Sequence, residues 1–328
     1  MTTYPAPCLR RLAGIVGVVG ISLVAAGATL RPPGGIWGFT APWDPRSAAS
    51  VRAHSRSLAV VVTGWLALDT LTAQPIALYR DTVAAPGARR FALVTNYFRD
   101  RFRPETIRRL AADSTLLAHT SDSLAHLASA GGYQGLVLDF EAMTPADVPA
   151  LQHVIKALTT AAHHRHVPTV AATVIAADTL AYPGRPLLQA ADQLIVMVYD
   201  QHWATGAPGP IASPDWARTL LAARIANAGS PAHLVVGLPV YGYEWLHHAP
   251  TVVVSLADAH RLATQWGTSL TRDSASANLS ASGPDSAQIW VADAPLLDTL
   301  RATAAHLGVT TVALWRLGLE DSTMWRSR

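Results

Sequence analysis

Short apolar runs alternate with polar, alanine-rich segments along the chain from residue 36 onward. The apolar runs lack a helical period and are rich in valine and leucine, which is typical of buried strands, while the segments between them have helical character. This rhythm predicts an α/β fold, and eight such strands predict one (β/α)₈ TIM barrel. The predicted strands are residues 36–41, 58–65, 90–96, 135–141, 168–174, 193–200, 233–240 and 309–315. The predicted helices are residues 46–55, 104–129, 145–164, 185–190, 214–228, 256–266 and 294–307.

The connection over 241–308 is too long for one βα unit and predicts a small insertion before the last strand. Within it, residues 252–256 and 288–293 have the composition of strands. The stretch 270–287 is rich in serine, alanine and aspartate, which predicts a mobile surface loop.

The N-terminal residues have the pattern of an export signal. Arg10 and Arg11 precede residues 12–30, which carry no charge. Such a segment is either a cleaved signal peptide or an uncleaved membrane tether. We therefore expect residues 1–31 to be a signal peptide or anchor and 32–328 to be the barrel. The protein is then secreted, periplasmic, or held on the outer side of the cytoplasmic membrane.

The charge distribution restricts the classes of molecule that the protein could bind, and the cysteine content restricts its disulfide bonds. Two of the 25 basic residues and none of the 22 acidic ones lie in residues 1–30, so the remainder is close to neutral. No basic cluster with interleaved aromatic residues is present, which argues against a nucleic-acid partner. The only cysteine, Cys8, precedes the apolar segment, so the exported part has no disulfide.

Two carboxylates end the fourth predicted strand. Asp139 and Glu141 are separated by one residue, so on a strand they point to the same face. Neighbouring carboxylates oppose each other's ionisation, and such a pair suits acid catalysis. The alternative is a chance pair, in which one acid is solvated and the other caps a loop.

Other polar and aromatic residues follow the remaining strands. In a barrel, residues at the carboxyl ends of the strands line the active site. Flat rings with polar edges suit the faces of sugars, although aromatic residues are also ordinary barrel packing. The residues at such ends are Trp43, Asn96, Tyr199, Asp200, Tyr241 and Trp315.

The segment GYQGLVLDFE (132–141) resembles the catalytic strand of glycoside hydrolase family 18, the chitinase-like enzymes, whose pattern is D-G-x-D-x-D-x-E. Gly135, Asp139 and Glu141 match, while Gln134 and Val137 replace the first two acids. Three later segments resemble further strands of that family in the same order, and the resemblance covers residues 36–322. It is closest to bacterial family 18 domains of the spore-germination type and to those fused with glycosyltransferases. The three segments are LIVMVYD (194–200), LVVGLPVYGYEW (234–245) and VTTVALWRLGLED (309–321).

The resemblance implies a retaining glycoside hydrolase that cleaves β-1,4-linked N-acetylglucosamine glycans, either chitin-like oligomers or peptidoglycan-type glycan. In that family the 2-acetamido group of the substrate is the nucleophile, an exception to the use of two protein carboxylates. The resemblance assigns Glu141 as general acid and base, Asp139 as the residue that orients the acetamido group, and Tyr199 as its hydrogen-bond donor. Asp200 and Trp315 would contact the sugar, and neither a metal nor another cofactor is needed. We expect Trp43, Asn96 and Tyr241 to bind substrate as well.

Two other interpretations remain open. Val137 removes a partner that many members offer to the residue at position 139, which leaves room for a non-catalytic chitinase-like glycan-binding module. A scaffold tethered through residues 12–30 is the third. His163, His164 and His166 lie before the fifth predicted strand, on the rim opposite the active site, so we predict no metal site there.

Overall fold

The computed structural model describes residues 35–79 and 81–326. The description that follows concerns the unit Pro33–Arg328. The predicted signal peptide or anchor, residues 1–31, lies outside the described residues. Among those that are described, no helix is both long and apolar enough to cross a membrane.

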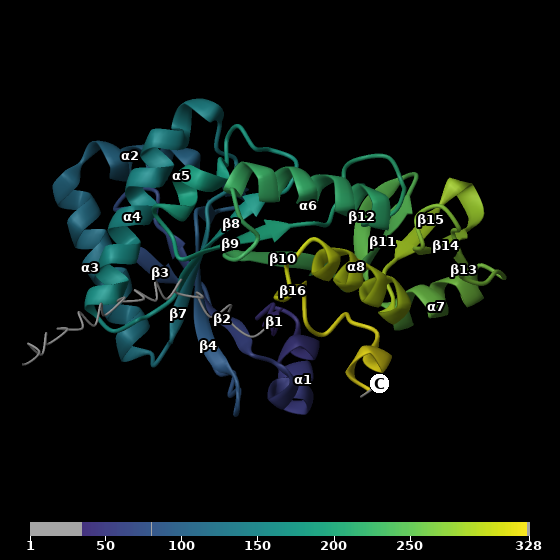
Figure 1. Ribbon diagram of the computed structural model, residues 1–328. Helices are drawn as coiled ribbons and strands as arrows, with labels where there is room; N and C mark the ends of the chain where they lie inside the picture. The colour runs from purple at the N-terminus through teal and green to yellow at the C-terminus, as the bar shows by residue number, and fades with distance from the viewer. Residues whose placement is uncertain (1–34, 80, 327–328) are drawn as a thin grey trace, which may run out of the picture. The chain divides into compact units, whose positions relative to one another are not determined.

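Eight parallel strands form a closed barrel, which confirms the predicted (β/α)₈ fold (Figure 1). Each strand pairs with the next one in the barrel sequence, and the pairing of β1 with β2, with Trp37 opposite Val60, closes the ring. All eight strand predictions fall on these elements. The barrel strands are β1 (Ile36–Phe39), β2 (Val60–Leu68), β4 (Arg89–Thr95), β7 (Gly135–Asp139), β8 (Val170–Ile175), β9 (Gln193–Met197), β10 (Leu234–Pro239) and β16 (Val312–Trp315).

The inside of the barrel is apolar. Side chains from alternate positions of the strands fill it, among them Phe91, Val137, Ile195 and Val235, each no more than 1% exposed. A second and larger apolar layer lies between the strands and the helices. Because parallel strands are covered on both faces, their sequences are nearly continuous apolar runs, which is why the strands could be predicted.

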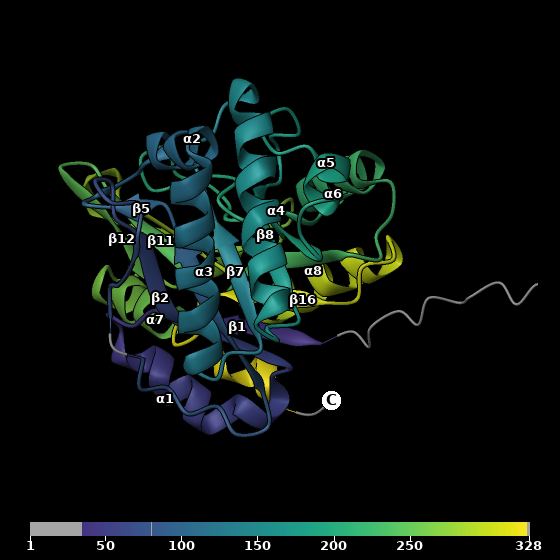
Figure 2. The ribbon, with the colours of Figure 1, turned by 90° about the vertical axis from the view of Figure 1, so that its left-hand side faces the viewer.

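Helices surround the barrel (Figures 1 and 2). The single helix predicted over 104–129 is wrong, because two helices occupy this stretch. Asp113 has an extended backbone between them, and its carboxylate accepts a hydrogen bond from the Leu116 amide at 2.9 Å, which caps the second helix. The α-helices are α1 (Pro45–His54), α2 (Pro104–Ala112), α3 (Ser114–Ala130), α4 (Val148–His164), α5 (Gly184–Leu188), α6 (Pro214–Ala228), α7 (Leu256–Gln265) and α8 (Ala294–His306). Short 3₁₀ helices are η1 (Ser55–Ser57), η2 (Pro145–Asp147), η3 (Pro284–Ser286) and η4 (Ser322–Trp325).

The connection from β2 to β4 contains no helix among its described residues. A short strand, β3 (Pro75–Ala77), pairs antiparallel with β2 instead. The Asp81 carboxylate fixes the rest of the connection, because it accepts hydrogen bonds from Thr63 Oγ1 at 2.9 Å, an Arg90 Nη at 2.6 Å and the Tyr133 hydroxyl at 2.5 Å. Hydrogen bonds to one partly buried carboxylate thus hold this connection in place of a packed helix.

The predicted insertion is a five-stranded antiparallel sheet with α7 packed against it. The prediction of a mobile loop over 270–287 is wrong, since this stretch forms a hairpin in that sheet. Its polar composition misled the prediction: Asn278 is fully buried and donates to the carbonyls of Ala212 and Ser276 at 2.8 and 2.9 Å. The strands are β11 (Gly242–Leu246), β12 (Ala249–Val254), β13 (Thr271–Arg272), β14 (Leu279–Ser282) and β15 (Gln288–Val291), and a separate hairpin consists of β5 (Tyr97–Phe98) and β6 (Arg101–Phe102).

Candidate active site

A cavity of about 470 Å³ opens at the carboxyl ends of the barrel strands. Asp139 is the last residue of β7, and Glu141 follows it on the same face. Phe140 points the other way and is buried in the layer beneath the helices. Side chains that line the cavity include Asp139, Glu141, Thr173, Tyr199, Trp203 and Trp315.

Asp139 is held by hydroxyl groups. Thr173 Oγ1 donates to Asp139 Oδ1 at 2.8 Å, and the Thr95 hydroxyl is a second donor. Burial raises the pKa of Asp139, and these two hydrogen bonds oppose that rise because they favour the charged form. Val137 lies two residues before Asp139 on the same face of β7, and it is fully buried among apolar side chains. Threonine hydroxyls from β4 and β8 thus contact Asp139, whereas Val137 offers it no polar partner.

Glu141 has different surroundings. No side chain or amide of the described residues donates a hydrogen bond to its carboxyl group. Burial raises the pKa of Glu141 to about 8, and the negative charges of Asp139 and Asp200 contribute in the same direction. Glu141 therefore keeps its proton at neutral pH while remaining open to the cavity.

Asn96 fixes the backbone at Glu141. Its side-chain amide donates to the Glu141 carbonyl at 3.0 Å and accepts from the Glu141 N–H at 2.9 Å. The side chain is fully buried, so both polar atoms are used within the protein. Asn96 was predicted to bind substrate, but the structure makes it a positioning residue for Glu141.

Asp200 and Tyr199 follow β9. Tyr241 and Tyr243 both donate their hydroxyls to Asp200 Oδ1, the latter at 3.0 Å. Tyr241 is 3% exposed and does not line the cavity, so it supports Asp200 rather than facing a ligand. Burial raises the pKa of Tyr199 well above its usual value, which keeps its hydroxyl protonated and able to donate.

Aromatic rings continue from the cavity to the rim. The rings of Tyr199 and Trp315 are nearly parallel, with centroids 6.4 Å apart. Trp315 then neighbours Trp65 at 6.2 Å, and Trp65 contacts Trp43 edge-on at 4.9 Å. Trp43 is 50% exposed and lies outside the cavity lining. Trp43 thus lies at the outer end of this row of rings, with Trp65 between it and Trp315.

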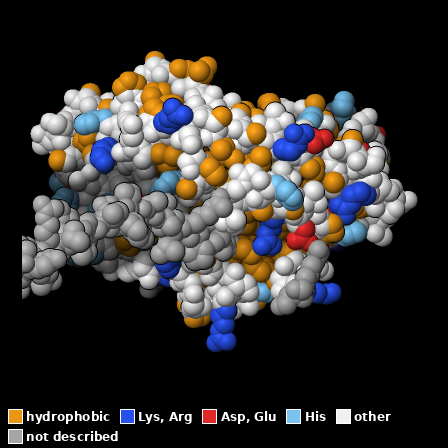
Figure 3. Space-filling view, in the orientation of Figure 1, with side chains coloured by type: hydrophobic (Ala, Val, Ile, Leu, Met, Phe, Trp, Pro, Cys, Tyr) orange, Lys and Arg blue, Asp and Glu red, His pale blue; other side chains and the backbone are white. Residues whose placement is uncertain are grey.

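An ion pair joins this rim to the first helix. Arg316, next to Trp315, donates to Asp44 Oδ2 at 2.9 Å and lies over the Trp43 ring. Hydrogen bonds from Arg46 and Arg316 hold the pKa of Asp44 well below its usual range. Elsewhere, basic side chains are scattered over the face seen in Figure 3 rather than gathered into a stripe.

The structure brings five of the predicted site residues into one cavity: Glu141, Asp139, Tyr199, Asp200 and Trp315. Sequence reasoning missed Thr173, although a signal for it existed. Ala171, Thr173 and Ile175 alternate inward on β8, and Thr173 is the polar one at the carboxyl end. Trp203, in the loop after β9, lines the mouth and carried no comparable signal.

No family model matches the chain. Among curated proteins, it is 24% identical over 253 residues to the uncharacterized glycosylase YvbX of Bacillus subtilis, covering 72% of this chain and 73% of that protein. It is also 22% identical to the cortical fragment-lytic enzyme of the same organism, covering 78% of this chain and 63% of that protein.

Solved structures have the same fold. The spore cortex-lytic enzyme SleL of Bacillus megaterium superposes with a TM-score of 0.79 at 15% identity, covering 89% of this chain and 72% of SleL. A GH18 chitinase from Cycas revoluta, in complex with (GlcNAc)₃, superposes with a TM-score of 0.73 at 17% identity. The match covers 88% of this chain and 97% of the chitinase chain. The resemblance to chitinase-like proteins of glycoside hydrolase family 18 is thereby confirmed.

Proposed function

We propose that this chain, which resembles the chitinase-like proteins of glycoside hydrolase family 18 in motifs and in fold, hydrolyses β-1,4-linked glycans that contain N-acetylglucosamine. The relatives support a glycoside hydrolase, and one structural neighbour binds an oligomer of N-acetylglucosamine. The observation that carries the proposal is the unequal pair of carboxyl groups in one cavity. Asp139 has hydroxyl donors that favour its charged form, whereas Glu141 has none and retains its proton.

In the proposed reaction, Glu141 protonates the oxygen of the leaving sugar. The carbonyl oxygen of the substrate's own 2-acetamido group attacks the anomeric carbon from the opposite side as that bond breaks. The Glu141 carboxylate then removes a proton from a water molecule, which opens the cyclic intermediate with overall retention of configuration. The side chain thus ends the cycle protonated, as it began.

The neighbours of Glu141 have separate roles in this scheme. Asp139 accepts the N–H of the acetamido group and stabilises the positive charge that develops on it. The Tyr199 hydroxyl donates to the acetamido carbonyl. Trp315 forms a flat apolar surface beneath the sugar ring.

The non-catalytic glycan-binding module remains the second candidate. The observation that favours it is the valine at position 137, which leaves Asp139 without a second acid two residues earlier on the strand. The Thr173 and Thr95 hydroxyls weaken that argument, because they give Asp139 the hydrogen-bond partners that a valine at position 137 cannot provide.

We further propose that the barrel acts outside the cytoplasm, because Arg10, Arg11 and residues 12–30 have the pattern of an export signal. Expression of the full chain followed by fractionation would find the barrel outside the cytoplasmic membrane. Recovery of the protein in the cytoplasm would contradict this.

The experiment that tests the reaction is hydrolysis of N-acetylchitotetraose by the full chain, followed by proton NMR. We expect the β-anomer of the new reducing end to form first and to mutarotate later. Cellotetraose, which lacks the acetamido group, should not be cleaved. Initial formation of the α-anomer would contradict the mechanism, and binding without cleavage would favour the glycan-binding module.

A further inference from the structure

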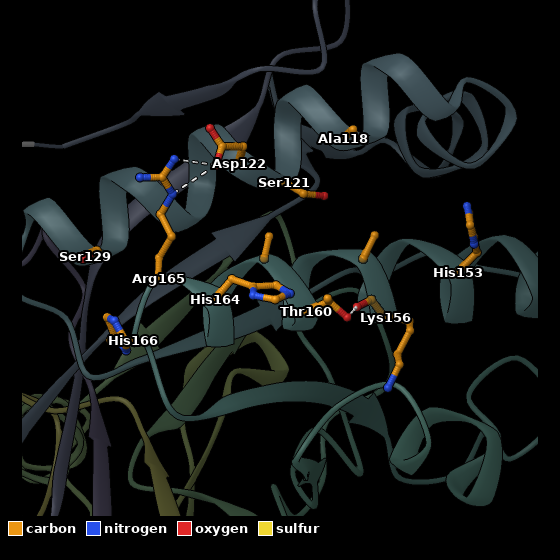
Figure 4. A pocket seen from close by; sticks show the side chains of 12 residues that line it. Ala118, Ser121, Asp122, Ser129, His153, Lys156, Thr160, His164, Arg165 and His166 are labelled. Atoms are coloured by element: carbon orange, nitrogen blue, oxygen red, sulfur yellow. Dashed lines mark hydrogen bonds and ion pairs between the residues drawn. The ribbon is translucent and has the colours of Figure 1, made fainter.

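A second hollow lies outside the barrel, in the groove between α3 and α4 (Figure 4). Figures 1 and 2 both show these helices side by side. The groove has a volume of about 890 Å³, which exceeds that of the catalytic cavity and lies within the range of ligand sites. None of its lining residues belongs to the catalytic cavity.

The floor of the groove consists mainly of small side chains, Ala118 and Ser121 from α3 and Ala157 and Ala161 from α4. Ser121 is 4% exposed, and its hydroxyl has no hydrogen-bond partner in the protein. A buried hydroxyl without a partner is unfavourable, so a ligand group that bonds to it gains affinity. Thr160, by contrast, donates to the Lys156 carbonyl at 2.8 Å.

The walls of the groove carry nitrogen-bearing side chains. His153, Lys156 and His164 lie along one side of α4, and His166 follows the helix. The one acid in the lining, Asp122, is already engaged by Arg165 Nε and Nη at 3.0 and 2.6 Å. No acid of the described residues forms an ion pair with Lys156. Lys156 thus leaves the groove with a positive charge that no acid of the described lining offsets, and this charge complements an acidic occupant.

The length and the floor restrict the form of that occupant. His153 and His164 are eleven positions apart on one helix, which corresponds to about 16 Å along the groove. An extended peptide of about five residues has this length. Because the floor is largely apolar, an occupant that also has apolar surface fits better than a bare inorganic polyanion.

We propose that the α3–α4 groove binds a short acidic peptide in extended conformation. Its carboxylates contact Lys156 and the neighbouring histidines, its small side chains lie on the alanine floor, and a main-chain group bonds to the Ser121 hydroxyl. This binding is independent of glycan hydrolysis.

The test uses the full chain and a fluorescein-labelled peptide, Ala-Glu-Ala-Glu-Ala amide, with binding followed by fluorescence anisotropy. We expect saturable binding that weakens at least tenfold in Lys156→Glu. Ala161→Leu, which fills the floor without changing charge, should weaken it similarly. Arg218→Glu is the matched control, since Arg218 is an exposed cation on α6, and it should bind like the parent.

Three results would overturn the proposal. The first is equal binding of the peptide in which glutamine replaces glutamate. The second is unchanged binding in both Lys156→Glu and Ala161→Leu, with circular dichroism showing folded variants. The third is binding of inorganic polyphosphate but not of the peptide, which would indicate a general polyanion site.

Discussion

Asp139 and Glu141 leave the same strand two residues apart, but their side chains have different neighbours. Thr173 and Thr95 donate to Asp139, whereas Glu141 lies in a partly buried position with only negative charges nearby. Environments that separate the pKa values of two carboxyl groups allow one to act as acid while the other is charged. This division of roles follows from two threonines that no catalytic motif includes.

Replacing Thr173 by valine should therefore lower kcat. Valine keeps the shape of threonine but removes the hydroxyl, which raises the pKa of Asp139 further and frees its carboxylate to turn. Loss of a hydrogen bond to a charged group costs about 1.5–3 kcal/mol, which corresponds to a decrease of about 10- to 100-fold. Thr173→Ser, which keeps a hydroxyl group, should retain most of the activity. Hydrolysis of a chitotriose glycoside measures kcat for both variants. Equal rates for the valine and parent enzymes would show that Thr173 has no such role.

The raised pKa of Glu141 also affects stability. A carboxyl group whose folded pKa lies above its unfolded value favours folding below the unfolded pKa, and this contribution is lost as pH rises through the folded pKa. For Glu141 that window runs from about 4.5 to about 8. Glu141→Gln removes the ionisable group, so its stability should match the parent near pH 4 and exceed it above pH 8.

The expected gain above pH 8 is on the order of 5 kcal/mol in the free energy of unfolding, because each unit of pKa shift corresponds to about 1.4 kcal/mol. Urea denaturation of both proteins at pH 4.5, 6.5 and 8.5 measures it. A difference that does not change with pH would mean that Glu141 titrates normally.

At the scale of elements, the apolar runs predicted every barrel strand, because both faces of a parallel strand are covered. The helix predicted over 104–129 was less accurate, since Asp113 could also have been an ordinary helical residue. The connection after β2 could not be predicted, because it depends on contacts of Asp81 with Thr63, Arg90 and Tyr133, which lie 18, 9 and 52 residues from it in sequence.

Alanine substitutions at Gly64 and Gly132 test how tightly the protein is packed around Tyr133, a partner of Asp81 in the β2–β4 connection. Gly64 and Gly132 both have a φ of +67°, a conformation that strains any residue with a Cβ. An added Cβ at Gly64 would collide with the Tyr133 hydroxyl, whereas at Gly132 nothing lies within 4 Å. Gly132→Ala should cost about 1 kcal/mol of stability and Gly64→Ala about 3 kcal/mol or more, because overpacking adds to the strain. Thermal unfolding of the two variants would contradict this if their melting temperatures fell equally.

Arg224 joins α6 to the segment after β8. Its side chain is 1% exposed and donates to four carbonyls, those of Ile175, Ala176, Asp178 and Tyr182. Burial lowers the pKa of Arg224 to about 10, so it remains charged at neutral pH.

Arg224→Met should therefore destabilise the protein by about 3–5 kcal/mol, because the buried carbonyls lose their donor. Arg218→Met, on the exposed side of the same helix, should change stability by less than about 0.5 kcal/mol. Chemical denaturation of the two variants measures the difference. A small effect at Arg224 would mean that water replaces the guanidinium.

At the scale of the whole molecule, barrel closure brings together groups that the sequence separates. Asp139 and Trp315 end β7 and β16, and Tyr199 follows β9. The rule that the carboxyl ends of barrel strands meet at one mouth was enough to group them. That rule does not give side-chain direction in the loops beyond the strands. Asn96 and Tyr241 therefore proved to be buried supports of Glu141 and Asp200, and Trp43 lies outside the cavity.

The measurement that tests the account most directly is hydrolysis of fluorogenic chitobiose and chitotriose glycosides by the parent and by Glu141→Gln. Glu244→Gln is the matched control, because Glu244 is a buried carboxyl group of the insertion that does not line the cavity. We predict turnover by the parent and by Glu244→Gln, and a loss of about 10²- to 10⁴-fold in Glu141→Gln. Full activity in Glu141→Gln would contradict the assignment of Glu141 as the catalytic acid.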